Sequence, residues 1–251
     1  MGRRNNFYFS LYWYLRPMTG KEYIEQIREY LSQLQAGFSE FQELHIVVDD
    51  GTRPITLDWA GFSAEVISEL PSDWAYNNKD DPKNRKFTLT STPAVAFSSS
   101  FTNGVNPGPR DVCSISFTMG CVDNDVNTLL IDFVPALENP VFLEKVFCHA
   151  IGYWTPNHAV LARPSYDDAL DQPIGDIRPG WLTYMKGTDA LPYIPERCTA
   201  EPLHEGILIR TLKRLPDTAD AEIIPILKQL RDALEPHGIL KNPKKRMKNK
   251  Q

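Results

Sequence analysis

Strand-like segments follow one another along this chain, with only three helical patterns among them. Period-two alternation and clusters of aromatic or β-branched residues predict extended segments near 6–15, 44–48, 87–90, 94–100, 112–119, 126–134, 158–163, 181–185 and 203–212. Strands here mostly neighbour strands, so the regular βαβ alternation of a parallel sheet is absent. We therefore expect an α+β fold with a single domain: a largely antiparallel or mixed sheet and about three helices.

The three helices have recognisable starts. Thr19 followed by Glu22 has the spacing of a capping box, and apolar residues then recur at helical spacing as far as Gly37. Asn139 before Pro140 predicts the start of a second helix, which ends near Gly152. A third helix is predicted at 222–235. Residues 54–70 are ambiguous, with room for one or two helical turns.

The length and composition are those of an ordinary globular protein. The chain has 251 residues, of which 42% are hydrophobic and 24% charged, a balance that can form a core without a metal or disulfides. No linker or internal repeat divides it. We expect one domain over 1–240 and a basic, disordered tail over 241–251.

The charge is unevenly distributed. The last eleven residues contain six Lys or Arg and no acid, which leaves 21 basic and 32 acidic residues in 1–240, a net charge of −11. An acidic body repels the phosphates of nucleic acid and favours encounter with a basic protein. Net negative charge also keeps a protein soluble, and composition alone favours that explanation.

The cysteines and the apolar segments indicate a cytoplasmic protein. Cys113, Cys121, Cys148 and Cys198 form no CxxC pair, so reduced, buried thiols are expected rather than a zinc site. The aromatic run Phe7–Leu15 resembles a signal peptide superficially but fits a strand better. No apolar run is long enough to span a bilayer. We expect no membrane association, and the sequence does not predict the oligomeric state.

Catalytic motifs are weak in this sequence. It contains no GxxxxGK[ST], HExxH or GxSxG motif. Cys148, His149 and His158 are the best catalytic candidates, but neighbouring helical positions point about 100° apart, which makes mutual activation of Cys148 and His149 difficult. We expect no enzyme activity, no cofactor and no metal. A thiol- or metal-dependent hydrolase using these three residues remains the alternative.

Acidic pairs and loop aromatics are the candidates for partner binding. Loops that project negative charge can hold a basic protein surface, and exposed aromatic rings can anchor it. The candidate residues are Asp49, Asp50, Trp74, Tyr76, Asp80, Asp81, Asp123, Asp125, Asp167, Asp168 and Asp171.

Four segments, in order from about residue 8 to 185, resemble one family. They are Tyr12-Trp13-Tyr14-Leu15-Arg16-Pro17, the stretch from Met119-Gly120 through Asn127 to Pro135, Trp154-Thr-Pro156-Asn-His-Ala159, and Gly180-Trp181-Leu-Thr-Tyr184. Together they are similar to the immunity protein 52 family of bacterial polymorphic toxin systems. One departure is the pair Tyr14-Leu15, where the family pattern has a small residue before the arginine.

The resemblance implies an α+β protein without catalysis that binds and neutralises a cognate toxin. The toxin would be a nuclease with a restriction-endonuclease-like fold, commonly delivered by type VI secretion. The motif residues Trp13, Arg16, Pro17, Trp154, Pro156, Gly180, Trp181 and Tyr184 would build the fold, while loops would make the contacts. A scaffold whose basic tail contacts nucleic acid or an acidic membrane is a third hypothesis.

Overall fold

The structure is a computed structural model that describes residues 5–14, 16–48, 51–69, 75–76, 89–90, 92–93, 96–104, 113–120, 126–172, 176–216 and 221–241. The chain divides into two compact units. The first unit is Tyr12–Asp132, and the second combines Met1–Leu11 with Phe133–Gln251. Strand β1 (Tyr8–Tyr14) contains the boundary. Among the described residues, no helix is both long and apolar enough to cross a membrane.

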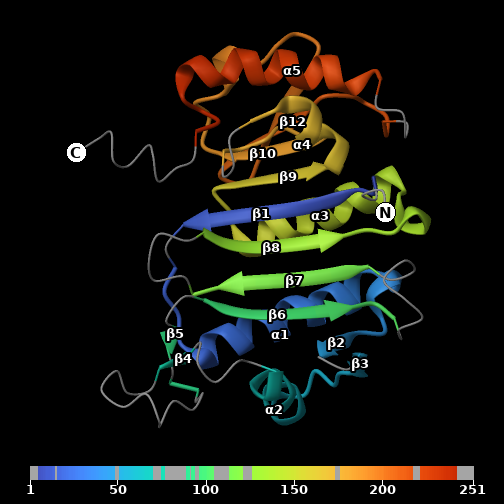
Figure 1. The fold of residues 1–251 in the computed structure, drawn as a ribbon, viewed down its shortest axis with the longest axis vertical. Helices are drawn as coiled ribbons and strands as arrows, with labels where there is room; N and C mark the ends of the chain where they lie inside the picture. The colour runs from blue at the N-terminus through green and yellow to red at the C-terminus, as the bar shows by residue number, and fades with distance from the viewer. Residues whose placement is uncertain are drawn as a thin grey trace. The chain divides into compact units, whose positions relative to one another are not determined.

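The first unit is an antiparallel sheet with two helices (Figure 1). Its strands are β2 (His45–Val48), β3 (Gly51–Pro54), β6 (Phe97–Thr102), β7 (Ser114–Met119) and β8 (Val126–Asp132). Its helices are α1 (Gly20–Gly37) and α2 (Trp59–Glu69). A separate short pair of strands is formed by β4 (Ala75–Tyr76) and β5 (Thr92–Pro93). The strands lie in the order β8-β7-β6-β2-β3. All pairings from β3 to β8 are antiparallel.

Helix α1 covers one face of this sheet. Thr19 and Glu22 form the predicted capping box, with the Thr19 amide donating to Glu22 Oε2 at 2.7 Å. Tyr23 then packs on Phe97 of β6 with ring centroids 5.0 Å apart, and its hydroxyl lies 2.6 Å from Ser99 Oγ. The face of the sheet that bears Phe97 and Ser99 is therefore the core of the unit.

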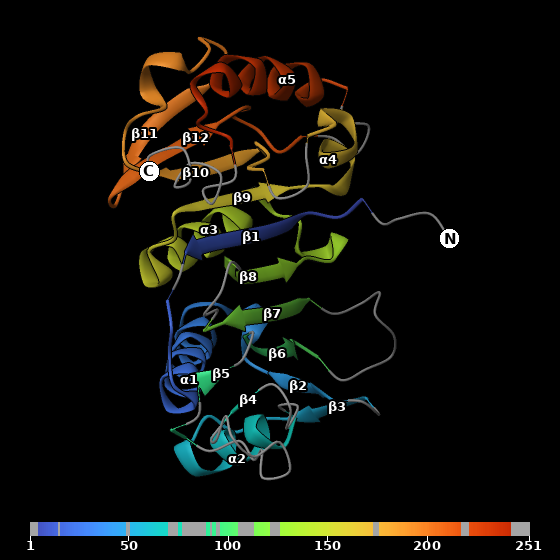
Figure 2. The ribbon, with the colours of Figure 1, turned by 60° about the vertical axis from the view of Figure 1, so that its left-hand side comes forward.

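The opposite face of β6, β7 and β8 carries mostly small polar side chains, together with the partly exposed Leu130, which pairs with Ser116. Ser98, Ser100, Ser116, Thr118 and Thr128 alternate with buried residues and are partly exposed. We call this surface the open face, because no described helix of the first unit lies on it in either view (Figures 1 and 2).

The second unit has strands in the order β11-β12-β10-β9-β1. They are β9 (His158–Ala162), β10 (Leu182–Lys186), β11 (Thr199–Leu203) and β12 (Gly206–Arg210), with β1 contributing its residues up to Leu11, and the helices are α3 (Pro140–Trp154), α4 (Pro164–Leu170) and α5 (Ile223–Leu234). Every residue of β9 is buried, as expected for a strand covered on both faces.

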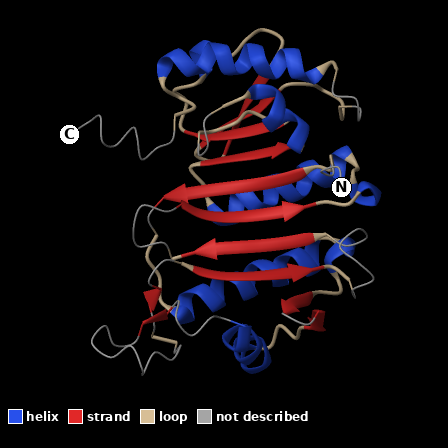
Figure 3. Ribbon diagram, in the orientation of Figure 1, coloured by secondary structure: helices blue, strands red, loops and turns tan. Residues whose placement is uncertain are grey.

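Helices cover both faces of the sheet in the second unit (Figure 3). Phe147 of α3 meets Phe9 of β1 with ring centroids 5.9 Å apart. On another part of the sheet, Leu230 and Leu234 of α5 share a buried cluster with Ile209 of β12. Burying such aliphatic side chains contributes about 1.5–3 kcal/mol each.

The prediction of about three helices is wrong, because the part of the chain that the structure describes contains five α-helices. Most of the stretch 54–70, which was ambiguous in the sequence, forms helix α2. Asp58 Oδ1 accepts a hydrogen bond from the Gly61 amide at 3.0 Å and so satisfies a backbone donor of the first turn of this helix. Helix α4 lies between the extended segments at 158–163 and 181–185, where the sequence predicts no helix. The helix begins at Pro164, and its residues Tyr166 and Leu170 are buried.

The predicted strand at 203–212 is present as β12, but it begins later than predicted, because Leu203 belongs to β11. The two strands form a hairpin in which Leu203 pairs with Gly206, with a two-residue turn at His204 and Glu205. His204 adopts a φ of 49° there. The predicted tail over 241–251 lies almost entirely outside the described residues, and the single domain over 1–240 stays a prediction.

Candidate partner-binding surfaces

Three of the predicted acidic contacts lie on or next to α4. Asp167 is half-buried: its Oδ2 accepts the Tyr8 hydroxyl at 2.7 Å and lies 3.5 Å from Arg178 Nη1. Burial raises the pKa of Asp167, although Tyr8 and Arg178 oppose that shift. Asp168 and Asp171 are exposed. Asp167 therefore ties α4 to β1, whereas the other two carboxylates face solvent.

The remaining predicted contacts lie in parts of the chain whose side chains are not described. Asp49, Asp50, Trp74, Asp80, Asp81, Asp123 and Asp125 lie outside the described residues, and of Tyr76 only the backbone, in β4, is described. An acidic surface formed by these loops stays a prediction.

The alternative catalytic residues lie in poor surroundings for nucleophilic chemistry. Cys148 and His149 are on α3, and His158 begins β9 with 7% of its surface exposed. Burial, with a further contribution from Glu144, raises the pKa of Cys148 to about 11, and burial lowers the pKa of His149. A reactive cysteine requires a lowered pKa. Within the described part of the chain, no three His, Cys, Asp or Glu side chains form a group that could hold a metal ion.

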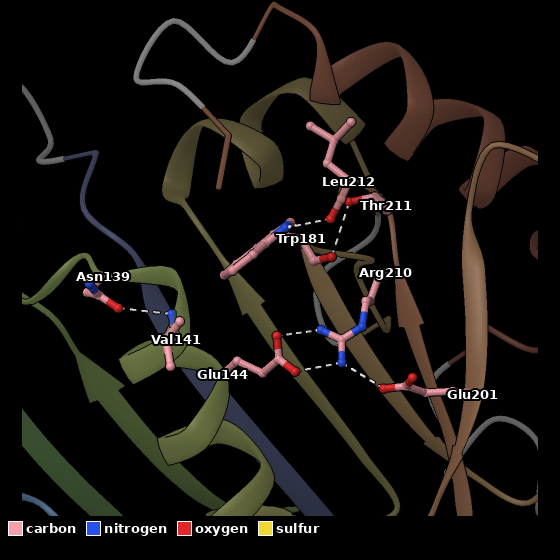
Figure 4. Close-up of polar contacts among 8 residues, drawn as sticks. All are labelled: Asn139, Val141, Glu144, Trp181, Glu201, Arg210, Thr211 and Leu212. Carbon is pink, nitrogen blue, oxygen red and sulfur yellow. Dashed lines mark hydrogen bonds and ion pairs between the residues drawn. The ribbon is translucent and has the colours of Figure 1, made fainter. Parts of the chain in front are cut away.

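Arg210 links two carboxylates from different elements of the second unit (Figure 4). Its Nη1 and Nη2 each lie 2.6 Å from an oxygen of Glu144 on α3, and Nη2 also donates to Glu201 Oε1 of β11 at 2.6 Å. Desolvation lowers the pKa of Arg210, but the hydrogen bonds to Glu144 and Glu201 outweigh it, and the net shift is upward. The sequence gives no local signal for this group, because Glu144 and Arg210 are 66 positions apart.

A large apolar side chain is exposed beside this group. Val141 is 60% exposed and lies three positions before Glu144 on α3 (Figure 4). The Asn139 side chain caps the helix by accepting the Val141 and Phe142 amides at 3.0 and 3.1 Å. The second unit thus presents an apolar group next to partly exposed carboxylates.

Most of the family-motif residues are buried. Trp13, Trp154, Trp181 and Tyr184 are at most 3% exposed; Pro156 and Gly180 are also buried, whereas Arg16 and Pro17 are exposed. Trp181 Nε1 donates to the Leu212 carbonyl at 3.0 Å (Figure 4). These buried positions suit a structural role.

Gly180 is required by its surroundings. A Cβ at this position would lie 2.4 Å from the Leu161 carbonyl oxygen and 2.5 Å from Val160 Cγ2. The backbone there approaches β9 too closely for any side chain.

Most of the acidic character belongs to one unit. The first unit contains nine Lys and Arg against 17 Asp and Glu, a net charge of −8, whereas the second has 18 against 15, a net charge of +3, or 12 against 15 and −3 without the basic tail at 241–251. The sequence alone distinguishes only the basic tail from the rest of the chain and does not reveal this division of charge.

Comparisons with known proteins identify a related fold but no family. No family model and no curated protein match the chain. A solved structure of the type VI secretion system (T6SS) protein PA0821 from Pseudomonas aeruginosa matches 93% of this chain and 76% of its own, with 14% sequence identity and a TM-score of 0.54. At that identity the likeness shows a shared fold alone, and membership of the immunity protein 52 family stays a prediction.

Proposed function

We propose that this chain is an immunity protein that binds a cognate secreted nuclease toxin, delivered by type VI secretion, and neutralises it by stoichiometric inhibition in the cytoplasm. The observation that carries the proposal is the net charge of −8 on the first unit. A nuclease must present a basic surface to hold phosphate. An acidic inhibitor complements that surface, which raises the rate of encounter and disfavours nucleic acid as a partner.

Two resemblances support the proposal. One is the ordered set of four segments that is similar to the immunity protein 52 family. The other is the fold shared with the T6SS protein PA0821. They are independent, since the first rests on short motifs and the second on backbone geometry.

The hydrolase alternative receives less support. A pKa of about 11 for Cys148 leaves very little thiolate at neutral pH. Inhibition by binding needs no such group, so the two hypotheses differ in what Cys148, His149 and His158 must do.

Co-expression tests the function directly. We expect bacterial cells that produce the protein encoded by the adjacent gene to recover growth when this chain is co-expressed. The purified pair should form a complex at micromolar or lower concentration. Absence of binding at micromolar concentration would overturn the proposal.

A triple variant separates inhibition from catalysis. The variant Cys148→Ala, His149→Ala, His158→Ala should still protect cells, provided that circular dichroism shows a folded protein. Loss of protection by this variant, with binding retained, would favour the hydrolase.

A further inference from the structure

We propose that the open face of the first unit is the docking surface for the basic surface of the toxin. This inference rests on the proposed function and adds to it the location of the interface and the chemistry of the contact. The surface is made of regular strands, so it differs from the loops that the sequence predicts as partner-binding.

The open face is defined by the strand register. Ser98 pairs with Thr118 and Ser100 with Ser116 across β6 and β7, and Thr118 pairs with Thr128 across β7 and β8. Paired residues in a sheet point to the same face. Since Phe97 and Phe117 face α1, these five hydroxyl side chains form a contiguous patch on the other side.

Hydrogen bonds hold part of this patch in place. Ser100 Oγ and Ser116 Oγ are 3.0 Å apart, and the Ser98 hydroxyl donates to the Phe117 carbonyl at 3.2 Å. A surface that is already ordered loses little conformational entropy when a partner binds. Short hydroxyl side chains also leave the patch flat enough for close approach of another backbone.

Larger side chains flank the hydroxyl patch. On one side, β1 is the neighbour of β8, and its partly exposed Tyr12 and Tyr14 alternate with buried Trp13. On the other side is Val47 of β2, which is 39% exposed; its neighbour Ile46 pairs with Phe101 on the α1 face, so Val47 points to the open face. Tyrosine combined with serine is a composition that suits protein recognition, because tyrosine supplies rigid contact area and serine supplies adaptable hydrogen bonds.

The charge of the unit selects the partner. A net charge of −8 attracts a basic protein surface and repels the phosphates of nucleic acid. It also repels a second copy of the same unit, which argues against a homodimer through this face. The patch itself is nearly neutral, with Asp132 at its edge accepting a hydrogen bond from Ser114 at 3.2 Å. The field of the unit would steer the partner, and the hydroxyl groups would make the contact.

Substitution at Thr118 tests the surface. Thr118→Lys places a long cation at the centre of the patch, and we expect affinity for the protein encoded by the adjacent gene, made catalytically inactive, to fall by about tenfold or more. Thr118→Glu introduces a side chain of similar size to lysine but of opposite charge, and it should lose less affinity than Thr118→Lys. Thr188→Lys is the matched control: the same substitution at an exposed turn of the second unit should change affinity by less than about twofold. Thr128→Lys repeats the test on the neighbouring strand in case Thr118→Lys does not fold.

The outcomes distinguish this inference from the function. If the wild-type chain fails to bind the probe, the proposed function is overturned, and the docking surface with it. If the wild type binds and the Lys variants at 118 and 128 bind as tightly as Thr188→Lys, the docking surface is wrong and the function stands. Light scattering that gives a dimer for the wild type and a monomer for Thr118→Lys would instead identify a second copy as the occupant, which also contradicts the inference.

Discussion

At the scale of single residues, the buried pair Arg163–Glu138 should contribute strongly to stability. The two side chains are 2.9 Å apart with exposures of 2% and 13%, and Arg163 also lies over the Phe7 ring at 4.2 Å. Glu138→Gln removes the carboxylate from a buried guanidinium, so we expect a loss of about 3 kcal/mol in the free energy of unfolding, measured with urea. Glu205→Gln is the control, because its pair with Lys186 is exposed to solvent and screened, so this variant should lose much less stability than Glu138→Gln. Equal losses from the two variants would contradict the prediction.

Contacts between residues close in the sequence could be predicted, whereas contacts between distant residues could not. The Thr19–Glu22 capping box was predictable because both partners lie within four positions and their spacing is diagnostic. The link from Arg210 to Glu144 and Glu201 was not, because the tertiary fold brings the three residues together and no local pattern marks them.

At the scale of elements, the cap of α3 can be tested. The Asn139 side chain accepts two backbone amides at the start of this helix. Asn139→Ala leaves those donors without a side-chain partner, so we expect a loss of about 1 kcal/mol in thermal or urea unfolding. Asn139→Asp should retain most of the stability, since a carboxylate can accept the same bonds and suits the positive end of the helix dipole. The proposed role of Asn139 as a cap is wrong if the aspartate variant loses as much as the alanine variant.

Helix length and composition explain which elements the sequence revealed. The predicted helices α1, α3 and α5 have 12 to 18 residues, long enough for apolar spacing to repeat. Helix α4 has seven residues and carries Asp167 and Asp168, so its composition is typical of a loop. The alternation at 112–119 correctly predicted β7, but a single strand cannot show that its small polar side chains join those of β6 and β8 in one patch.

At the scale of the whole molecule, the division of charge between the units predicts how association depends on salt. Glu43 in the first unit and Glu196 in the second are both exposed, so reversal of either charge should leave the fold intact. If the first unit receives the toxin, Glu43→Lys should slow association with the probe by about twofold or more at low ionic strength, and Glu196→Lys should slow it less, because electrostatic steering depends on charge near the docking surface. Stopped-flow measurements should show this difference shrinking as salt approaches 1 M, where the screening length falls to about 3 Å. Equal effects of the two reversals would mean that the toxin responds to net charge alone, and the acidic first unit would then have no special part in recognition.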